Sequence, residues 1–181
     1  LKLVKRPVRP ADVISETVQA HAPDAERKDL PLKADIAPEL SRLAMIDANR
    51  LRQILSNLLG NAIKFTDKGE VRLKAHLTDQ GLVRVEVHDT GPGMNETVQK
   101  RVFGRFEQAD MSHSRTHEGS GLGLAIAREL VTLMGGQIGV TSQLGQGACF
   151  WFEFPAPVAN HEDAAQEVSQ TRPAASSKII N

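Results

Sequence analysis

The sequence lacks the features that mark several classes of protein. Its single cysteine, Cys149, excludes an internal disulfide, favours a reducing compartment and is expected in the core. Its 22 basic and 22 acidic residues cancel, so no global field draws the chain to nucleic acid or an anionic membrane. No apolar run approaches the roughly 20 residues that span a bilayer, and the N-terminus lacks the pattern of a signal peptide. We therefore expect a soluble, cytoplasmic domain without membrane contact, whose specificity depends on a local site.

The 181 residues, of which 40% are hydrophobic, are enough for one domain with a real core. We assign this domain to residues 1–157. Residues 158–181 are rich in Ala, Ser, Gln and Glu and are predicted to form a flexible linker. The chain begins at Leu1 rather than at a methionine and ends shortly after the apolar pair Ile179-Ile180. Both ends are interpreted as cuts in a longer protein.

An amphipathic helix is predicted from about Ala48 to Phe65, with Asp47 as its cap. Its apolar residues recur at spacings of three and four and form one buried stripe: Leu51, Ile54, Leu55, Leu58, Leu59, Ala62 and Ile63. At about 100° per residue, Asn57, Asn61 and Lys64 fall together on the flank of that stripe. This flank can face a ligand.

Further strands, helices and a loop are predicted around this helix. Alternation of apolar and polar residues predicts strands at residues 1–8, 30–36, 71–77, 83–88, 138–142 and 149–154. Helices are expected at about 10–22, 95–106 and from about 123 to a stop at Gly135-Gly136. Residues 109–119 offer only Met111 for packing and are predicted to be a mobile loop.

Five short motifs follow one another along the chain: NLLGNAIKFT (57–66), DTGPG (89–93), VFGRFEQAD (102–110), GSGLGLAIA (119–127) and GQGACF (145–150). Alone, each glycine motif is more often a turn than a nucleotide loop. In this order they closely resemble the N, first glycine, phenylalanine, second glycine and third glycine boxes of histidine kinases. That branch belongs to the superfamily that includes gyrase, mismatch-repair and chaperone ATPases. The resemblance covers about residues 1–155 and implies an α/β (α+β) two-layer sandwich, with helices on one face of a mixed sheet.

The first two boxes have a chemical interpretation. The amide oxygen of Asn61 is a hard, neutral ligand suited to Mg²⁺. Asn57 can position the phosphate tail and Lys64 can supply a point charge, so these two are the expected catalytic residues. The resemblance implies that Asp89 accepts the exocyclic amine of adenine. Gly91 and Gly93 permit positive φ and let the backbone approach the base.

The later boxes are expected to hold the phosphates at an exposed helix N-terminus. The residues of this phosphate site are Gly119, Ser120, Gly121, Leu122, Gly123 and Leu124. The segment 104–120 corresponds to the family's ATP lid, hinged at Phe103 and Phe106. Arg105 or Arg115 could reach the γ-phosphate, or either could be a solvated charge. The third glycine box contributes Gly145 and Gly147, but carries Ala148 where the family commonly has a hydroxyl residue, which puts one phosphate or packing contact in doubt.

The resemblance implies the ATP-binding catalytic domain of a bacterial sensor histidine kinase, which uses Mg-ATP. The family's acceptor box, His-acid-any-basic-Thr-Pro, does not occur, so the acceptor is expected on a separate dimerisation domain and the isolated chain should be an inactive monomer. FEQAD and RELVTLMGG are similar to hybrid kinases, in which a receiver domain follows. Two alternatives stay open: a gyrase-type ATPase clamp, opposed by Asn57 in place of the glutamate base, and a degenerate nucleotide-binding module, suggested by Ala148.

Overall fold

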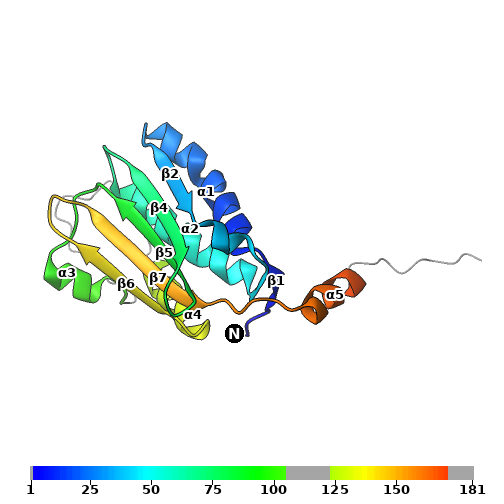
Figure 1. Ribbon diagram of the computed structural model, residues 1–181. Coiled ribbons are helices and arrows are strands. Elements are labelled where there is room, and N and C mark those ends of the chain that lie inside the picture. The colour runs from blue at the N-terminus through cyan, green and yellow to red at the C-terminus, as the bar shows by residue number, and fades with distance from the viewer. Residues whose placement is uncertain (1, 105–122, 171–181) are drawn as a thin grey trace, which may run out of the picture.

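The computed structural model describes residues 2–104 and 123–170. It contains a five-stranded mixed sheet with helices packed on one face, as Figure 1 shows. The order is β2-β4-β5-β7-β6, in which β2 pairs parallel with β4 and the other pairs are antiparallel. The five strands are β2 Leu32–Ile36, β4 Val71–Leu77, β5 Leu82–Asp89, β6 Gln137–Ser142 and β7 Ala148–Pro155. The predicted two-layer mixed-sheet fold is confirmed.

The core lies between this sheet and helix α2, Ala48–Phe65. All seven residues of the predicted apolar stripe are buried. The alternate residues Val83, Val85 and Val87 of β5 face the same core, as do the phenylalanines of β7. Asp47 caps α2 through a hydrogen bond from the backbone N–H of Arg50, so the predicted start of the helix is confirmed.

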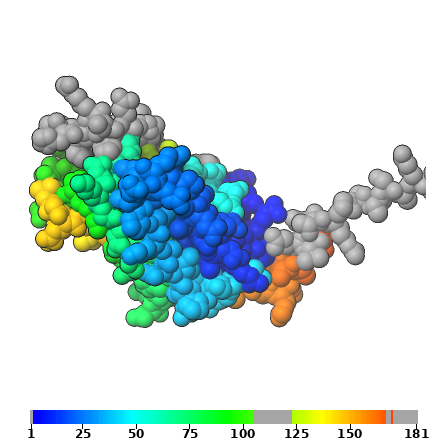
Figure 2. Space-filling model, turned by 90° about the horizontal axis from the view of Figure 1, so that it is seen from above, coloured from blue at the N-terminus to red at the C-terminus, as the bar shows by residue number. Residues whose placement is uncertain are grey.

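Helix α1, Pro10–Arg27, lies against α2 and β2, and the blue atoms of α1 and β2 lie side by side in the space-filling view (Figure 2). The prediction that this helix ends near Ala22 was wrong. Pro23 removes one backbone donor but does not stop the helix. The last turn instead continues far enough to bury Ala25, which is 1% exposed.

Two other helices follow, one against α2 and one beside β6 at the edge of the sheet. Helix α4, Gly123–Leu133, packs against α2 and ends before Gly135, whose φ of 80° suits a helix stop. Helix α3, Glu96–Arg101, is shorter than the predicted span of 95–106, and the side chain of Asn95 caps its N-terminus.

Strands β1, Arg6–Val8, and β3, Ala44–Ile46, form a separate two-stranded sheet, linked to β2 by the short 3-10 helix Pro38–Ser41. Val158 continues this sheet by bridging Ala44. The segment predicted as a flexible linker, 158–181, contains helix α5, His161–Gln170; its role as a linker stays a prediction. Asn160 and Asp163 exchange side-chain to backbone hydrogen bonds of 2.9 and 3.0 Å, and this reciprocal cap starts the helix.

The expectation that Cys149 lies in the core was wrong. It alternates with Phe150 on β7, and it is Phe150 that faces the helices. Cys149 therefore lies half-buried on the opposite face of the sheet rather than in the core. In the part of the chain that the structure describes, no helix is both long and apolar enough to cross a membrane.

Candidate nucleotide-binding site

The candidate site lies where β5 ends and β7 begins. Asp89, the last residue of β5, stands directly opposite Ala148, the first residue of β7. The end of α2 lies at this edge, because the Phe65 carbonyl is close to Gly91, and the start of α4 contacts α2 through the hydrogen bond from Asn57 to Gly123. The fold thus brings together the N box, the first and third glycine boxes and the end of the second glycine box.

Asp89 is held by its neighbours in one orientation. The backbone N–H groups of Gly91 and Ala148 both donate to Oδ1, at 3.0 and 3.2 Å. Burial raises the pKa of Asp89 above its ordinary value, while these two hydrogen bonds act in the opposite direction. Since both donors use the same oxygen, Oδ2 is the atom suited to accept a hydrogen bond from a ligand.

The glycines of the first box have different roles. Gly93 has a φ of 70°, as predicted, whereas Gly91 is absent from the residues with positive φ. Gly91 is needed for space: a Cβ would lie 3.0 Å from the Phe65 carbonyl oxygen and 3.1 Å from Asp89 Oδ1. The loop after β5 therefore packs directly against the C-terminus of α2.

The glycines of the third box support this loop from the other side. Gly147, with a φ of 81°, has no room for a Cβ, because the added atom would overlap the backbone oxygen of Asp89. Gly145 donates its backbone N–H to the Pro92 carbonyl at 2.7 Å. The structure therefore places Gly145 and Gly147 as packing partners of the loop that carries Asp89.

Thr66 is a member of the site that the sequence reasoning missed. It is 0% exposed, and its hydroxyl has no hydrogen-bond partner within the described part of the chain. The hydroxyl lies 3.3 Å from the position of a Cβ on Gly91, beside the Asp89 loop. A buried hydroxyl without a partner is costly, so a ligand or water that pairs with it is expected there. Its position as the last letter of the N box was the available signal.

The predicted polar flank of α2 faces the start of α4. Asn57 donates from Nδ2 to the Gly123 carbonyl at 2.9 Å. Asn61 lies one turn further along α2 and is half-buried, and Leu124 in the first turn of α4 is half-buried as well. The Lys64 ammonium lies 5.4 Å from the centroid of the Phe65 ring. The structure thus confirms that these three residues share a flank, but leaves their roles toward a ligand as predictions.

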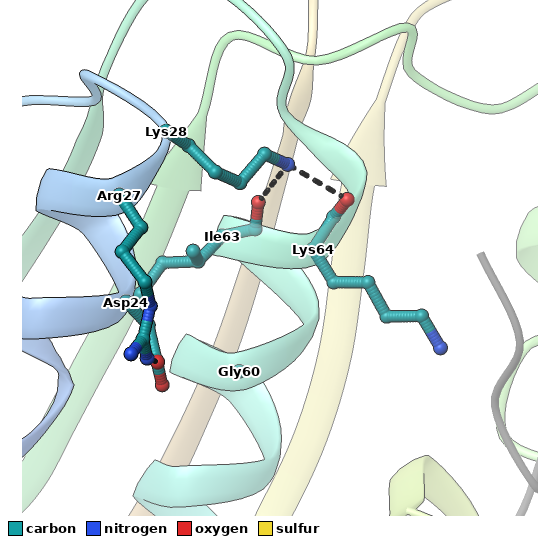
Figure 3. Close-up of a pocket in the computed structure, with 6 residues that line it drawn as sticks. All are labelled: Asp24, Arg27, Lys28, Gly60, Ile63 and Lys64. Carbon is teal, nitrogen blue, oxygen red and sulfur yellow. Dashed lines mark hydrogen bonds and ion pairs between the residues drawn. The ribbon is translucent and has the colours of Figure 1, made fainter. Parts of the chain in front are cut away.

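The C-terminus of α2 is capped by a residue that the sequence reasoning did not select. Lys28 donates from Nζ to the carbonyls of Ile63 and Lys64 at 2.7 and 3.1 Å (Figure 3). A cation at the end of a helix also interacts favourably with the helix dipole. Figure 3 shows that the Lys64 side chain extends away from Lys28.

A cavity of about 300 Å³ lies between α1 and α2 next to this cap. Its lining consists of Asp24, Arg27, Lys28, Gly60, Ile63 and Lys64, and Arg27 is paired with Asp24. The cavity shares only Lys64 with the predicted site and does not contain Asp89, so it is a neighbour of the nucleotide site rather than the site itself.

Phe103 packs edge-on against Phe150, with ring centroids 6.1 Å apart, and thereby anchors the chain just before residue 105. Several predicted site residues lie outside the described residues: Arg105, Phe106, Arg115, Gly119, Ser120, Gly121 and Leu122. The predicted lid and its mobile loop over 109–119 also lie outside the described residues.

Comparison with known proteins gives a consistent result. The family described as histidine kinase-, DNA gyrase B-, and HSP90-like ATPase matches residues 46–158. The chain is 45% identical over 130 residues to the sensor histidine kinase AruS of Pseudomonas aeruginosa, covering 70% of this chain and 12% of that protein. It is 39% identical to the histidine-protein kinase BarA of Escherichia coli K12, covering 84% of this chain and 17% of BarA.

A solved structure is similar over most of the chain. Full-length ShkA in complex with AMPPNP superposes with a TM-score of 0.79 and 40% identity, covering 88% of this chain and 32% of ShkA. The chain spans only a small part of these relatives, 12% of AruS and 17% of BarA.

Proposed function

This chain belongs to the family of histidine kinase-, DNA gyrase B- and HSP90-like ATPases, and we propose that it binds Mg-ATP and passes the γ-phosphoryl group to a histidine on a separate dimerisation domain. Its relatives AruS and BarA are named as histidine kinases, and this supports the assignment of the chain as the ATP-binding catalytic domain of a two-component kinase. The step from ATP to a histidine on another domain is the proposal.

The observation that carries the proposal is the orientation of Asp89. Two backbone N–H groups hold Oδ1, so Oδ2 is the oxygen suited to accept the exocyclic amine that adenine has and guanine lacks at that position. The buried hydroxyl of Thr66 lies beside the same loop and can pair with the base or with a water that bridges to it. This edge of the sheet therefore fits a purine that carries its amino group at position 6, as adenine does.

Residues of α2 fit the phosphate end of the nucleotide. The hydrogen bond from Asn57 to the Gly123 carbonyl brings the α2 flank to the first turn of α4. Unpaired N–H groups at such a helix start favour phosphate, and Gly123 and Leu124 contribute to this turn. When bound, Mg²⁺ neutralises charge on the phosphates. Asn61 offers the neutral amide oxygen that this hard ion accepts, and Lys64 adds a cation on the same flank.

The chemistry of Asn57 favours phosphoryl transfer over hydrolysis. Its Nδ2 is a hydrogen-bond donor to a backbone carbonyl, a role that an ionised carboxylate cannot fill. An amide is also not a base, so Asn57 cannot activate a water. Positioning of the phosphates and neutralisation of their charge then supply the catalysis.

The proposal extends to the partners. The dimerisation domain presents the acceptor histidine, and a receiver domain of the hybrid type follows this chain. BarA is much longer than this chain, which spans 17% of it, so a relative of this length has room for both further domains. A cytoplasmic location follows from the same assignment.

The test is transfer of labelled γ-phosphate from ATP to a histidine-bearing dimerisation domain supplied as a second protein. We expect acid-labile, base-stable label on the supplied domain, dependent on both magnesium and this chain. Release of inorganic phosphate without labelled acceptor would identify the chain as a hydrolase instead.

The matched control is Lys74→Gln, an exposed residue on the sheet face opposite the helices. This variant should transfer labelled phosphate to the acceptor at the rate of the unchanged chain. Asp89→Asn should transfer less labelled phosphate when ATP is limiting.

A further inference from the structure

The sheet face turned away from the helices carries a cluster that the nucleotide site does not use. Glu86 and His88 lie two positions apart on β5 and therefore point to the same face. Cys149 stands directly opposite His88 on β7. Within the described residues, one ligand atom from each of these three side chains lies within 4.8 Å of the other two.

The distances are close to those around a tetrahedral metal ion. Cys149 Sγ lies 3.7 Å from His88 Nε2, and that nitrogen lies 2.9 Å from Glu86 Oε2. Zinc bonds of about 2.0–2.1 Å to nitrogen and oxygen and about 2.3 Å to sulfur imply separations of about 3.6 Å for N–S and about 3.3 Å for N–O. The distance from sulfur to nitrogen already fits, and the distance from nitrogen to the carboxylate oxygen has to lengthen by about 0.4 Å.

The carboxylate is oriented by groups around it. Arg84 donates from Nε to Glu86 Oε1 at 2.8 Å, so Oε1 is occupied and Oε2 faces His88. Arg84 is held in turn by Glu153 at 2.8 Å and by the Trp151 ring, whose centroid is 4.4 Å away. Groups that hold a ligand in this way are typical of the outer shell of metal sites.

The charges around the cluster allow a divalent ion. Two cations on β4 stand opposite the cluster: Arg72 faces His88, and Lys74 faces Glu86. Arg72 is paired with Asp35 at 3.0 Å and Lys74 is exposed, which weakens the repulsion from both. Burial and the Glu86 charge raise the pKa of Cys149 to about 11, so an ion must displace the thiol proton and binding releases a proton.

We propose that Glu86, His88 and Cys149 form a zinc site on the outer face of the sheet, with one carboxylate oxygen, one imidazole nitrogen and one thiolate as protein ligands. Water completes the four-coordinate shell. The mixed oxygen, nitrogen and sulfur set selects a borderline-soft divalent ion rather than Mg²⁺. The site joins β5 to β7 on the face opposite the helices, next to the pair Asp89 and Ala148 but on the other side of the sheet from the core.

The test uses Co²⁺ as a spectroscopic substitute for Zn²⁺, with the whole chain, without nucleotide and in excess magnesium to occupy oxygen sites. We expect a near-ultraviolet thiolate-to-cobalt band and visible bands of a tetrahedral ion, with one metal per chain. Because Cys149 is the single cysteine, the thiolate band reports this site alone. Added Zn²⁺ should remove both sets of bands.

Variants then assign the ligands. Cys149→Ser should abolish the thiolate band, and His88→Gln and Glu86→Gln should each weaken cobalt binding at least tenfold. His76→Gln is the matched control, because His76 is an exposed histidine on β4, and it should bind as the unchanged chain does.

The proposal is overturned if the unchanged chain shows no thiolate band, since this result does not depend on any variant. It is also overturned if His88→Gln binds cobalt with undiminished affinity, or if one metal bridges two chains in sedimentation measurements. In those cases the three side chains form only a hydrogen-bonded cluster with Arg84.

Discussion

Asp89 shows how a single carboxylate can be prepared for recognition. Its Oδ1 is held by two backbone donors, and its Oδ2 is oriented by that constraint. An asparagine can keep its own oxygen on the same donors but offers an amide nitrogen in place of Oδ2. For Asp89→Asn we expect ATP affinity to fall by about 1–3 kcal/mol, because a charge-assisted acceptor is lost. Titration calorimetry measures the change.

The control for Asp89→Asn is Asp79→Asn, in the exposed turn between β4 and β5, which should leave the affinity unchanged. Equal affinity of the unchanged chain for GTP and ATP would contradict the assignment of Asp89 to adenine.

Asn61 is predicted to act on the metal rather than on the fold. Its side chain lies beside the buried stripe of α2 and is half-buried. Asn61→Ala should abolish magnesium-dependent ATP binding or transfer while the thermal midpoint stays within a few degrees, because alanine is a strong helix former. Fluorescent-nucleotide binding with and without magnesium measures the effect.

Asn49→Ala is the matched control, since Asn49 is an exposed asparagine on the same helix. Unchanged magnesium dependence in Asn61→Ala would remove Asn61 from the metal site.

At the scale of elements, the start of α2 depends on Asp47. This side chain is 6% exposed. It accepts from the Arg50 N–H at 3.1 Å and from the Val4 N–H at 2.8 Å. Asp47→Ala should lower the free energy of unfolding by about 1–3 kcal/mol, because a buried carboxylate that accepts from two backbone N–H groups is removed. Urea unfolding measures this loss.

Asp12→Ala removes an exposed acid from the first turn of α1 and should cost less than about 0.5 kcal/mol. A similar loss in both variants would show that Asp47 has no special role as a cap.

The packing of the third glycine box against the first glycine box also belongs to the scale of elements. Gly145 and Gly147 both have positive φ, but a Cβ on Gly145 would have open space, whereas one on Gly147 would overlap the Asp89 backbone oxygen. Gly145→Ala should cost about 1–2 kcal/mol from its backbone conformation, and Gly147→Ala about 3 kcal/mol or more. Gly147→Ala should also weaken ATP binding, because it displaces the strand end that carries Asp89. Unfolding and calorimetry on the pair measure both effects, and equal losses would contradict the packing role.

At the scale of the whole molecule, we expect the isolated chain to be monomeric and not to label itself. In the described residues the exposed large apolar side chains are few: Val4, Leu133, Leu144 and Val158. A stable dimer needs a larger apolar surface than such separate residues supply. Sedimentation equilibrium checks the mass. Acid-labile phosphate on any of the six histidines, or a dimer at micromolar concentration, would refute this expectation.

Much of the fold and part of the site depend on relations between near neighbours, and these were predictable from sequence. The stripe of α2, its Asp47 cap and the alternating strands involve residues within a few positions of one another, and each of the five boxes is a short local motif. Helix and strand periodicity turn such spacings directly into faces. The shared flank of Asn57, Asn61 and Lys64 follows from the same rule.

Tertiary structure alone decided the contacts between distant residues. The N–H of Ala148 reaches Asp89 from 59 positions away, and Lys28 reaches Ile63 from 35 positions away. The burial of Thr66 and the meeting of His88 with Cys149, 61 positions apart, likewise depend on which strands pair and in which register. A sequence pattern shows which face a residue occupies, but not which residue lies opposite it. Register and helix packing are settled by the whole core at once.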